Sequence, residues 1–120
     1  MSYVEVQGQA LVDLGSNLAI VSEWIDQAPA NAARDPEAQT WGRLSKVAEE
    51  CGEVISAFIG ATGQNPRKGV CDSDEHVVEE LLDVALTALA AWEHMTGNNG
   101  GSGKALAAHT LLRMKRVGLT

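Results

Sequence analysis

Two groups of acidic side chains have the spacing needed to hold a metal ion. Glu49, Glu50 and Glu53 form the first group, and Glu80 and Asp83 form the second. Residues three positions apart lie on one face of a helix, so Glu50 pairs with Glu53, and Glu80 pairs with Asp83. Two such helices facing each other would bring four carboxylates together, and these cannot all stay ionised at close range without cations.

Asp83 is the only charged residue in the apolar segment from Leu81 to Trp92. A buried carboxylate is costly unless it is paired or bound to a metal, so we expect Asp83 to have a cation. Oxygen ligands favour hard ions, which predicts Mg²⁺, Mn²⁺ or Ca²⁺ rather than zinc. Taken alone, the acidic residues around Glu50 are also explained as the solvated face of a helix.

Other metal sites and nucleotide motifs do not fit this sequence. Ferritin-like di-iron bundles use Glu-x-x-His, and Glu53 and Asp83 stand where histidine would be needed. The chain has no P-loop, no Cys/His zinc spacing and no EF-hand ladder. Its net charge of −7 argues against a DNA or RNA polymer as partner, because phosphate contacts need a basic surface.

The apolar residues recur at three- and four-residue steps, which predicts amphipathic helices. We expect four of them, at about residues 9–28, 36–60, 74–96 and 104–117. Asp35 before Pro36 fits an N-cap followed by proline at the first helical position, Ser73 or Asp74 could cap the third helix, and Gly97 fits its end. The remaining segments are expected to connect the helices: residues 1–8 as an extended lead-in or an early helical turn, 29–37 and 61–74 as loops, and 98–103 as a flexible turn.

No segment has a convincing strand pattern, so the predicted fold is all-α, a single domain over residues 1–120 arranged like a four-helix bundle. The third helix is apolar nearly all round, so we expect oligomerisation to complete the bundle. The hydrophobic share of 45% suits a globular domain. We expect a cytoplasmic protein without membrane contact, because neither a signal peptide nor an apolar stretch long enough to span a bilayer is evident.

The second helix has one predicted core face and one acidic face. The acidic face holds Lys46 and the first carboxylate group, and Ala57 and Gly60 extend it as small residues. Cys51 is expected to be a buried, inert thiol on the core face, and Cys71 a free thiol in a loop. The core face is expected to consist of Trp41, Leu44, Ala48, Cys51, Ile55 and Phe58.

The segment Glu49-Glu50-Cys51-Gly52-Glu53, followed after 26 residues by Glu80-Leu81-Leu82-Asp83, resembles the EExxE…ExxD signature of the MazG-like, all-α nucleoside triphosphate pyrophosphohydrolases. The likeness covers roughly residues 38–96. It implies a Mg²⁺-dependent enzyme that cleaves a nucleoside triphosphate to the monophosphate and pyrophosphate. It also implies a homodimer or homotetramer, as in other members of that family.

The resemblance carries roles onto matching residues. Metal ligands would be Glu50, Glu53, Glu80 and Asp83, and Glu49 and Glu50 would act in catalysis, Glu49 by supporting the ligands or positioning water. Lys46, one turn before the first group, would contact phosphate. Arg113, Lys115 and Arg116 on the fourth helix would be further phosphate contacts, although cations are also typical of a last helical turn.

Three questions stay open at this point. Phosphoribosyl-ATP pyrophosphohydrolases share the Lys-x-x-Glu-Glu-x-x-Glu start seen from Lys46 to Glu53, so that substrate is one alternative. A non-catalytic, oligomeric helical interaction module is another, in which Asp83 would pair with a cation such as Arg113. His76, one turn before Glu80, either orients a metal ligand or is an ordinary surface histidine.

Overall fold

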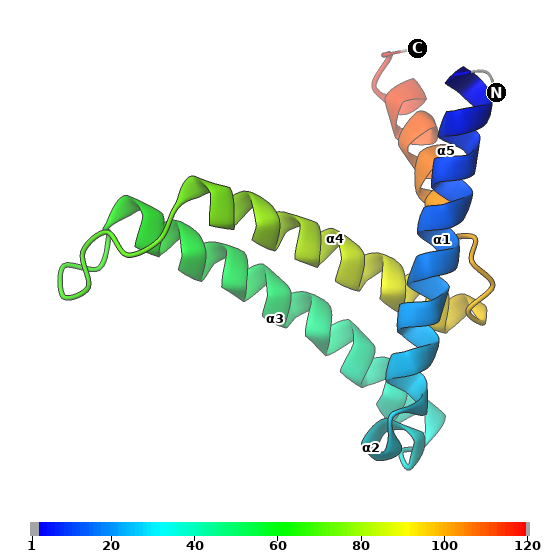
Figure 1. Ribbon diagram of the computed structural model, residues 1–120, viewed down its shortest axis with the longest axis horizontal. Coiled ribbons are helices and arrows are strands. Elements are labelled where there is room, and N and C mark those ends of the chain that lie inside the picture. Colours follow the sequence, from blue (N-terminus) through cyan, green and yellow to red (C-terminus); the bar gives the residue numbers. More distant parts are fainter. Residues whose placement is uncertain (1–2, 120) are drawn as a thin grey trace. The chain divides into compact units, whose positions relative to one another are not determined.

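The computed structural model describes residues 3–119, with side chains from residue 7 onward, and this part of the chain contains helices and no strand (Figure 1). The all-α prediction is therefore confirmed. The helices in chain order are α1 (Tyr3–Gln27), α2 (Pro29–Ala32), α3 (Pro36–Thr62), α4 (Asp74–Thr96) and α5 (Ser102–Arg116).

The ends of α3 and α4 have the caps that the sequence predicts. Asp35 Oδ1 accepts a hydrogen bond from the backbone N–H of Ala38 at 3.0 Å, and Pro36 occupies the first turn. Ser73, rather than Asp74, caps α4, because its Oγ accepts from the backbone N–H of residue 76 at 3.2 Å. Gly97 follows α4 with a φ of +89°, a conformation that glycine adopts without strain.

Three boundaries differ from the prediction. α1 begins at Tyr3, which agrees with the early helical turn and not with the extended alternative. The loop expected at 29–37 contains the short helix α2, where Pro29 takes the first helical position that proline favours. α5 begins at Ser102, inside the segment expected to be a flexible turn.

The chain divides into two compact units, which are described separately. The first unit combines the described residues up to Arg34 with those from Leu89 onward, and the second is Asp35–Ala88. The single domain expected over residues 1–120 stays a prediction.

In the first unit, α1 packs against α5, and it meets the turn before α5 through glycines. Gly15 on α1 is buried, and a Cβ placed there would collide with the carbonyl oxygen of Gly100. A Cβ on Gly103 would likewise collide with the backbone of Leu11. The absence of both side chains lets the backbone of α1 touch the turn at Gly100 and the first turn of α5 at Gly103.

Glu93 holds the glycine-rich turn in place. Its side chain is fully buried, and its two carboxylate oxygens accept the backbone N–H groups of Gly100 and Ser102, each at 2.8 Å. The negative charge also lies at the N-terminal end of α5, where the helix dipole favours it. The segment is a turn, as predicted, and these two hydrogen bonds restrain its backbone, which the sequence did not indicate.

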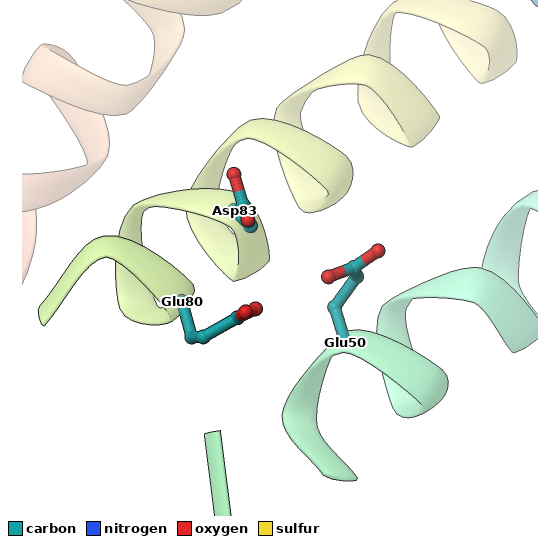
Figure 2. A group of neighbouring side chains, drawn as sticks. All are labelled: Glu50, Glu80 and Asp83. Carbon is teal, nitrogen blue, oxygen red and sulfur yellow. The ribbon is translucent and has the colours of Figure 1, made fainter. Parts of the chain in front are cut away.

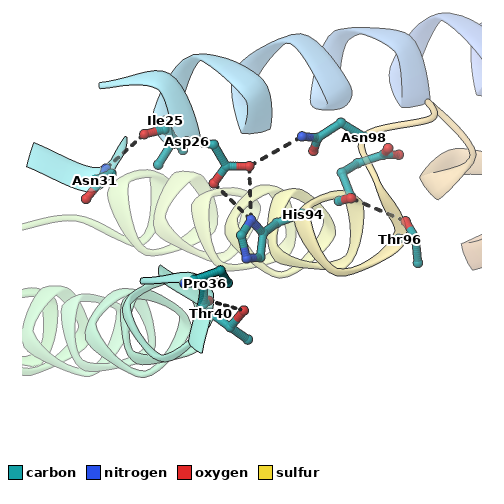
Figure 3. Close-up of polar contacts among 9 residues, drawn as sticks. Ile25, Asp26, Asn31, Pro36, Thr40, His94, Thr96 and Asn98 are labelled. Carbon is teal, nitrogen blue, oxygen red and sulfur yellow. Dashed lines mark hydrogen bonds and ion pairs between the residues drawn. The ribbon is translucent and has the colours of Figure 1, made fainter. Parts of the chain in front are cut away.

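A second polar cluster joins α1 to the end of α4 (Figure 3). His94 Nδ1 lies 2.9 Å from both carboxylate oxygens of Asp26, and Asn98 Nδ2 donates to Asp26 Oδ2 at 3.3 Å. His94, in the last turn of α4, thus connects that turn to α1.

In the second unit, α3 uses its small-residue side for packing. Ala57 and Gly60 are buried, and a Cβ on Gly60 would lie only 2.8 Å from the Cβ of Asp72. The stripe expected to form the core is exposed instead, with Trp41 at 63% and Ile55 at 62%. That expectation is therefore wrong for the single chain. The contact at Gly60 is with Cys71 and Asp72 in the segment before α4, and this contact leaves the apolar stripe of α3 uncovered.

One further expectation fails for the same reason. Cys51, on the stripe that α3 exposes, is an exposed free thiol and not a buried one, whereas Cys71 is the exposed free thiol expected. On α4, Leu81, Leu82 and Leu86 are also exposed, so the single chain does not bury this helix all round. No helix in the described residues has both the length and the apolar character needed to cross a membrane.

Candidate metal centre

Three of the four predicted metal ligands converge within the second unit (Figure 2). Glu50 projects from α3, and Glu80 and Asp83 project from α4 toward it. One carboxylate oxygen from each residue lies within 4.8 Å of the other two. The three-residue step on α4 thus places both of its carboxylates opposite α3, as the helical periodicity predicts.

The burial of these carboxylates differs from the expectation. The side chains of Glu50 and Glu80 are only 12% and 13% exposed, whereas Asp83 is exposed. The inference from a buried Asp83 is therefore wrong, because the leucines beside it on α4 face outward. The carboxylates that are largely shielded from water are those of Glu50 and Glu80.

Glu80 has one carboxylate oxygen that the described residues do not satisfy. Its Oε1 lies 2.8 Å from His76 Nε2, while its Oε2 is buried without a hydrogen-bond partner among those residues. A buried acceptor without a partner costs about 1–3 kcal/mol, and more when it is charged. A divalent cation would remove this cost, and an all-oxygen donor set is the kind that Mg²⁺ and Mn²⁺ prefer. The residues therefore fit such an ion.

Glu53, the fourth predicted ligand, lies beside this group but outside it. It is exposed, and the charge of the Glu50 carboxylate is the main cause of its raised pKa, followed by desolvation and the charge of Glu80. Its proximity to Glu50 and Glu80 makes ionisation harder, as expected where carboxylates crowd together. Its role as a ligand stays a prediction.

Lys46 partly neutralises the site from α3. Its Nζ lies 3.0 Å from Glu49 Oε1 and 3.3 Å from Glu50 Oε1. The hydrogen bond to Glu49, with that to Glu50, raises the pKa of the Lys46 ammonium. Glu49 is more exposed than Glu50, so it lies at the rim of the site.

The remaining predicted phosphate contacts lie elsewhere in the chain. Arg113, Lys115 and Arg116 are exposed residues in the last turn of α5, which belongs to the first unit. Arg113 Nε donates to His109 Nε2 at 3.4 Å. The part these three cations take in binding phosphate stays a prediction.

The structure adds one residue that the sequence reading missed, Asp72. His76 Nδ1 lies 2.8 and 2.9 Å from the two Asp72 oxygens, so this ring contacts carboxylates through both nitrogens. The hydrogen bond that His76 donates to Asp72 is the main cause of the raised pKa of His76, and the same bond lowers the pKa of Asp72. The four-residue spacing of Asp72, His76 and Glu80 was the signal that could have revealed the set.

Comparisons of the chain with protein-family models, with curated proteins and with solved structures find no match. Membership of the MazG-like family thus stays a prediction from the paired motif, and the chemistry of the site is argued from its own residues.

Proposed function

We propose that the chain is a Mg²⁺-dependent nucleoside triphosphate pyrophosphohydrolase that releases a nucleoside monophosphate and pyrophosphate. The observation that carries this proposal is the convergence of Glu50, Glu80 and Asp83, of which Glu80 also has a buried oxygen without a hydrogen-bond partner among the described residues. A set of three carboxylates from two helices suits a hard cation and leaves other positions for water and phosphate. The EExxE…ExxD pattern of the sequence supports the same activity.

The reaction joins one oxygen of water to phosphorus, breaks one bridging P–O bond and releases one proton. A bound Mg²⁺ would supply charge neutralisation for the polyphosphate and would acidify water. Glu50, Glu80 and Asp83 would hold the ion, and Glu53 is the adjacent carboxylate available as a further ligand. Glu49 is 59% exposed at the rim, which suits a group that positions the attacking water.

Lys46 would change partners when the site is loaded. It now shares its ammonium group between Glu49 and Glu50. A cation bound to Glu50 would take over the neutralisation of that carboxylate. Lys46 would then be available for a substrate phosphate, as the resemblance implies.

We also propose that the active form is a homo-oligomer. Side chains as large as Trp41, Ile55 and Phe58 are more than half exposed along α3. A contiguous apolar surface of this kind usually marks an interface. Light scattering coupled to size-exclusion chromatography would give the mass, and a monomer at micromolar concentration would contradict this part of the proposal.

A nucleotide panel tests the activity directly. The purified protein is incubated with each ribo- and deoxyribonucleoside triphosphate and with phosphoribosyl-ATP, with Mg²⁺ or with EDTA, and the products are separated by ion-exchange chromatography. Monophosphate and pyrophosphate are expected only with Mg²⁺. Turnover of phosphoribosyl-ATP alone would assign the alternative substrate.

Two variants and a matched control connect the activity to the site. Glu80→Gln and Asp83→Asn are expected to abolish turnover while the helical circular dichroism spectrum is retained. Glu79→Gln makes the same change at the neighbouring exposed position of α4 and is expected to leave turnover intact. No turnover of any nucleotide, together with no Mg²⁺ binding, would favour the interaction module instead.

A further inference from the structure

We propose that Asp72 and His76 position Glu80 for the metal ion, by binding one of its oxygens and leaving the other directed at the ion. This inference rests on the proposed function, because it assigns a role within the same metal site. By this inference His76 contributes to ion binding, although His76 is not one of the three converging ligands.

The geometry forms a continuous chain of polar contacts along the start of α4. Asp72 contacts His76 Nδ1 at 2.8 and 2.9 Å, and His76 Nε2 lies 2.8 Å from Glu80 Oε1. The steps of four residues place all three side chains on one side of the helix. Ionised carboxylates only accept hydrogen bonds, so both ring nitrogens of His76 donate.

The far end of this chain of contacts is anchored to α3. Asp72 Oδ1 accepts the backbone N–H of Ser73 at 2.8 Å. The Cβ of Asp72 packs at Gly60, where any added side chain would collide with it, and the backbone N–H of Cys71 donates to the Gly60 carbonyl at 3.0 Å. Asp72 is therefore held in place by backbone contacts, and its contact with His76 Nδ1 restrains the His76 ring.

The two carboxylate oxygens of Glu80 consequently have different environments. Oε1 is bound by His76, and Oε2 is buried without a hydrogen-bond partner among the described residues, in a side chain that converges with Glu50 and Asp83. A free glutamate side chain loses much rotamer freedom when it binds an ion, whereas Glu80 is already held. Partners that orient metal ligands in this way typically account for about 10- to 100-fold in ion affinity.

Mn²⁺ binding measured by electron paramagnetic resonance tests this role without using activity. His76→Ala is expected to weaken Mn²⁺ binding by about 10- to 100-fold. His76→Gln, which keeps a donor for Glu80, should lose less, and Asp72→Asn should fall between wild type and His76→Ala. His109→Ala, an exposed histidine on α5, is the matched control and should bind Mn²⁺ as the wild type does.

The outcomes separate this inference from the proposed function. If the wild type binds Mn²⁺ and His76→Ala binds it with equal affinity, the positioning role is overturned and the proposed function still stands. Lower thermal stability of His76→Ala with unchanged Mn²⁺ affinity would also overturn it, because that result indicates a purely structural contact. Absence of Mn²⁺ binding by the wild type would overturn both.

Discussion

Replacing Asp83 by asparagine removes one of three negative charges that lie close together, so the metal-free protein should become more stable. Asp83 offers an oxygen within 4.8 Å of oxygens of Glu50 and Glu80. At this separation in water, each pair of unit charges repels by about 0.9 kcal/mol. A Debye length of about 8 Å at physiological salt roughly halves this energy, so the loss of two pairs stabilises the apoprotein by about 1 kcal/mol.

The order of stability should reverse when Mg²⁺ is added. At a free concentration of 100 times its dissociation constant, Mg²⁺ stabilises the wild type by about 2.7 kcal/mol. A variant that binds the ion a hundredfold more weakly would gain only about 0.4 kcal/mol at the same concentration. Asp83→Asn is thus expected to melt above the wild type in EDTA and below it in Mg²⁺.

Differential scanning calorimetry at one fixed protein concentration measures both parts of this prediction. For a chain of this length, about 1 kcal/mol corresponds to a shift of the melting temperature by about 3–5 °C. Glu79→Gln removes one charge from an exposed site on the same helix and controls for the change in net charge. A metal-free Asp83→Asn less stable than the wild type, or an equal response of both proteins to Mg²⁺, would refute the reasoning.

Further predictions concern the packing, the buried carboxylate and the histidine. Gly15→Ala should lower the free energy of unfolding by about 1–3 kcal/mol, because its new methyl group would collide with the turn. Gly8→Ala has open space around it and should raise the free energy of unfolding by up to about 1 kcal/mol. Equal effects of the two substitutions in urea unfolding would contradict the close contact at Gly15. Glu93→Gln should cost about 1–3 kcal/mol in the same assay, because an amide offers only one acceptor oxygen for two N–H groups, one buried and one part-buried. NMR titration should place the pKa of His76 above the usual 6.5 or so, and Asp72→Asn should bring it down. Because this pKa is raised by folding, the stability it contributes is fully present below the unfolded pKa and is lost as the pH rises through the folded one.

Local chemistry was sufficient to predict most helix boundaries. Asp35 with Pro36 marks the start of α3, and Gly97 marks the end of α4, because a cap or a stop acts through its immediate neighbours. The same locality explains why the restraint on the glycine-rich turn was not predicted. Its restraint comes from Glu93 and from Gly15, and no local pattern of glycines reports such distant partners.

Hydrophobic periodicity identified the apolar side of α3 but not the side that packs within the chain. The stripe that includes Trp41 and Phe58 matched a core, whereas Ala57 and Gly60 form the buried side. Periodicity shows which side avoids water and does not show whether the same chain covers it. The apolar surroundings of Asp83 in the sequence led to the same kind of error.

The candidate site was more predictable, because it depends on helical spacing and on the pairing of two helices. Glu80 and Asp83 lie opposite Glu50, as their three-residue step predicts. Side-chain conformation decides the rest: Glu53 lies outside the converging group, and His76 takes one oxygen of Glu80. These side-chain conformations depend on contacts in three dimensions, which cannot be deduced from the spacing of residues along the chain.

The exposed thiol of Cys51 provides a chemical reporter for the apolar stripe of α3. A maleimide should label it at the rate of an ordinary accessible cysteine when the stripe is open, and much more slowly when another chain covers it. Cys71 is also an exposed free thiol, but it lies in the loop before α4, so it serves as an internal reference in the same molecule. The ratio of the two labelling rates against protein concentration would then give the affinity of self-association without any substrate.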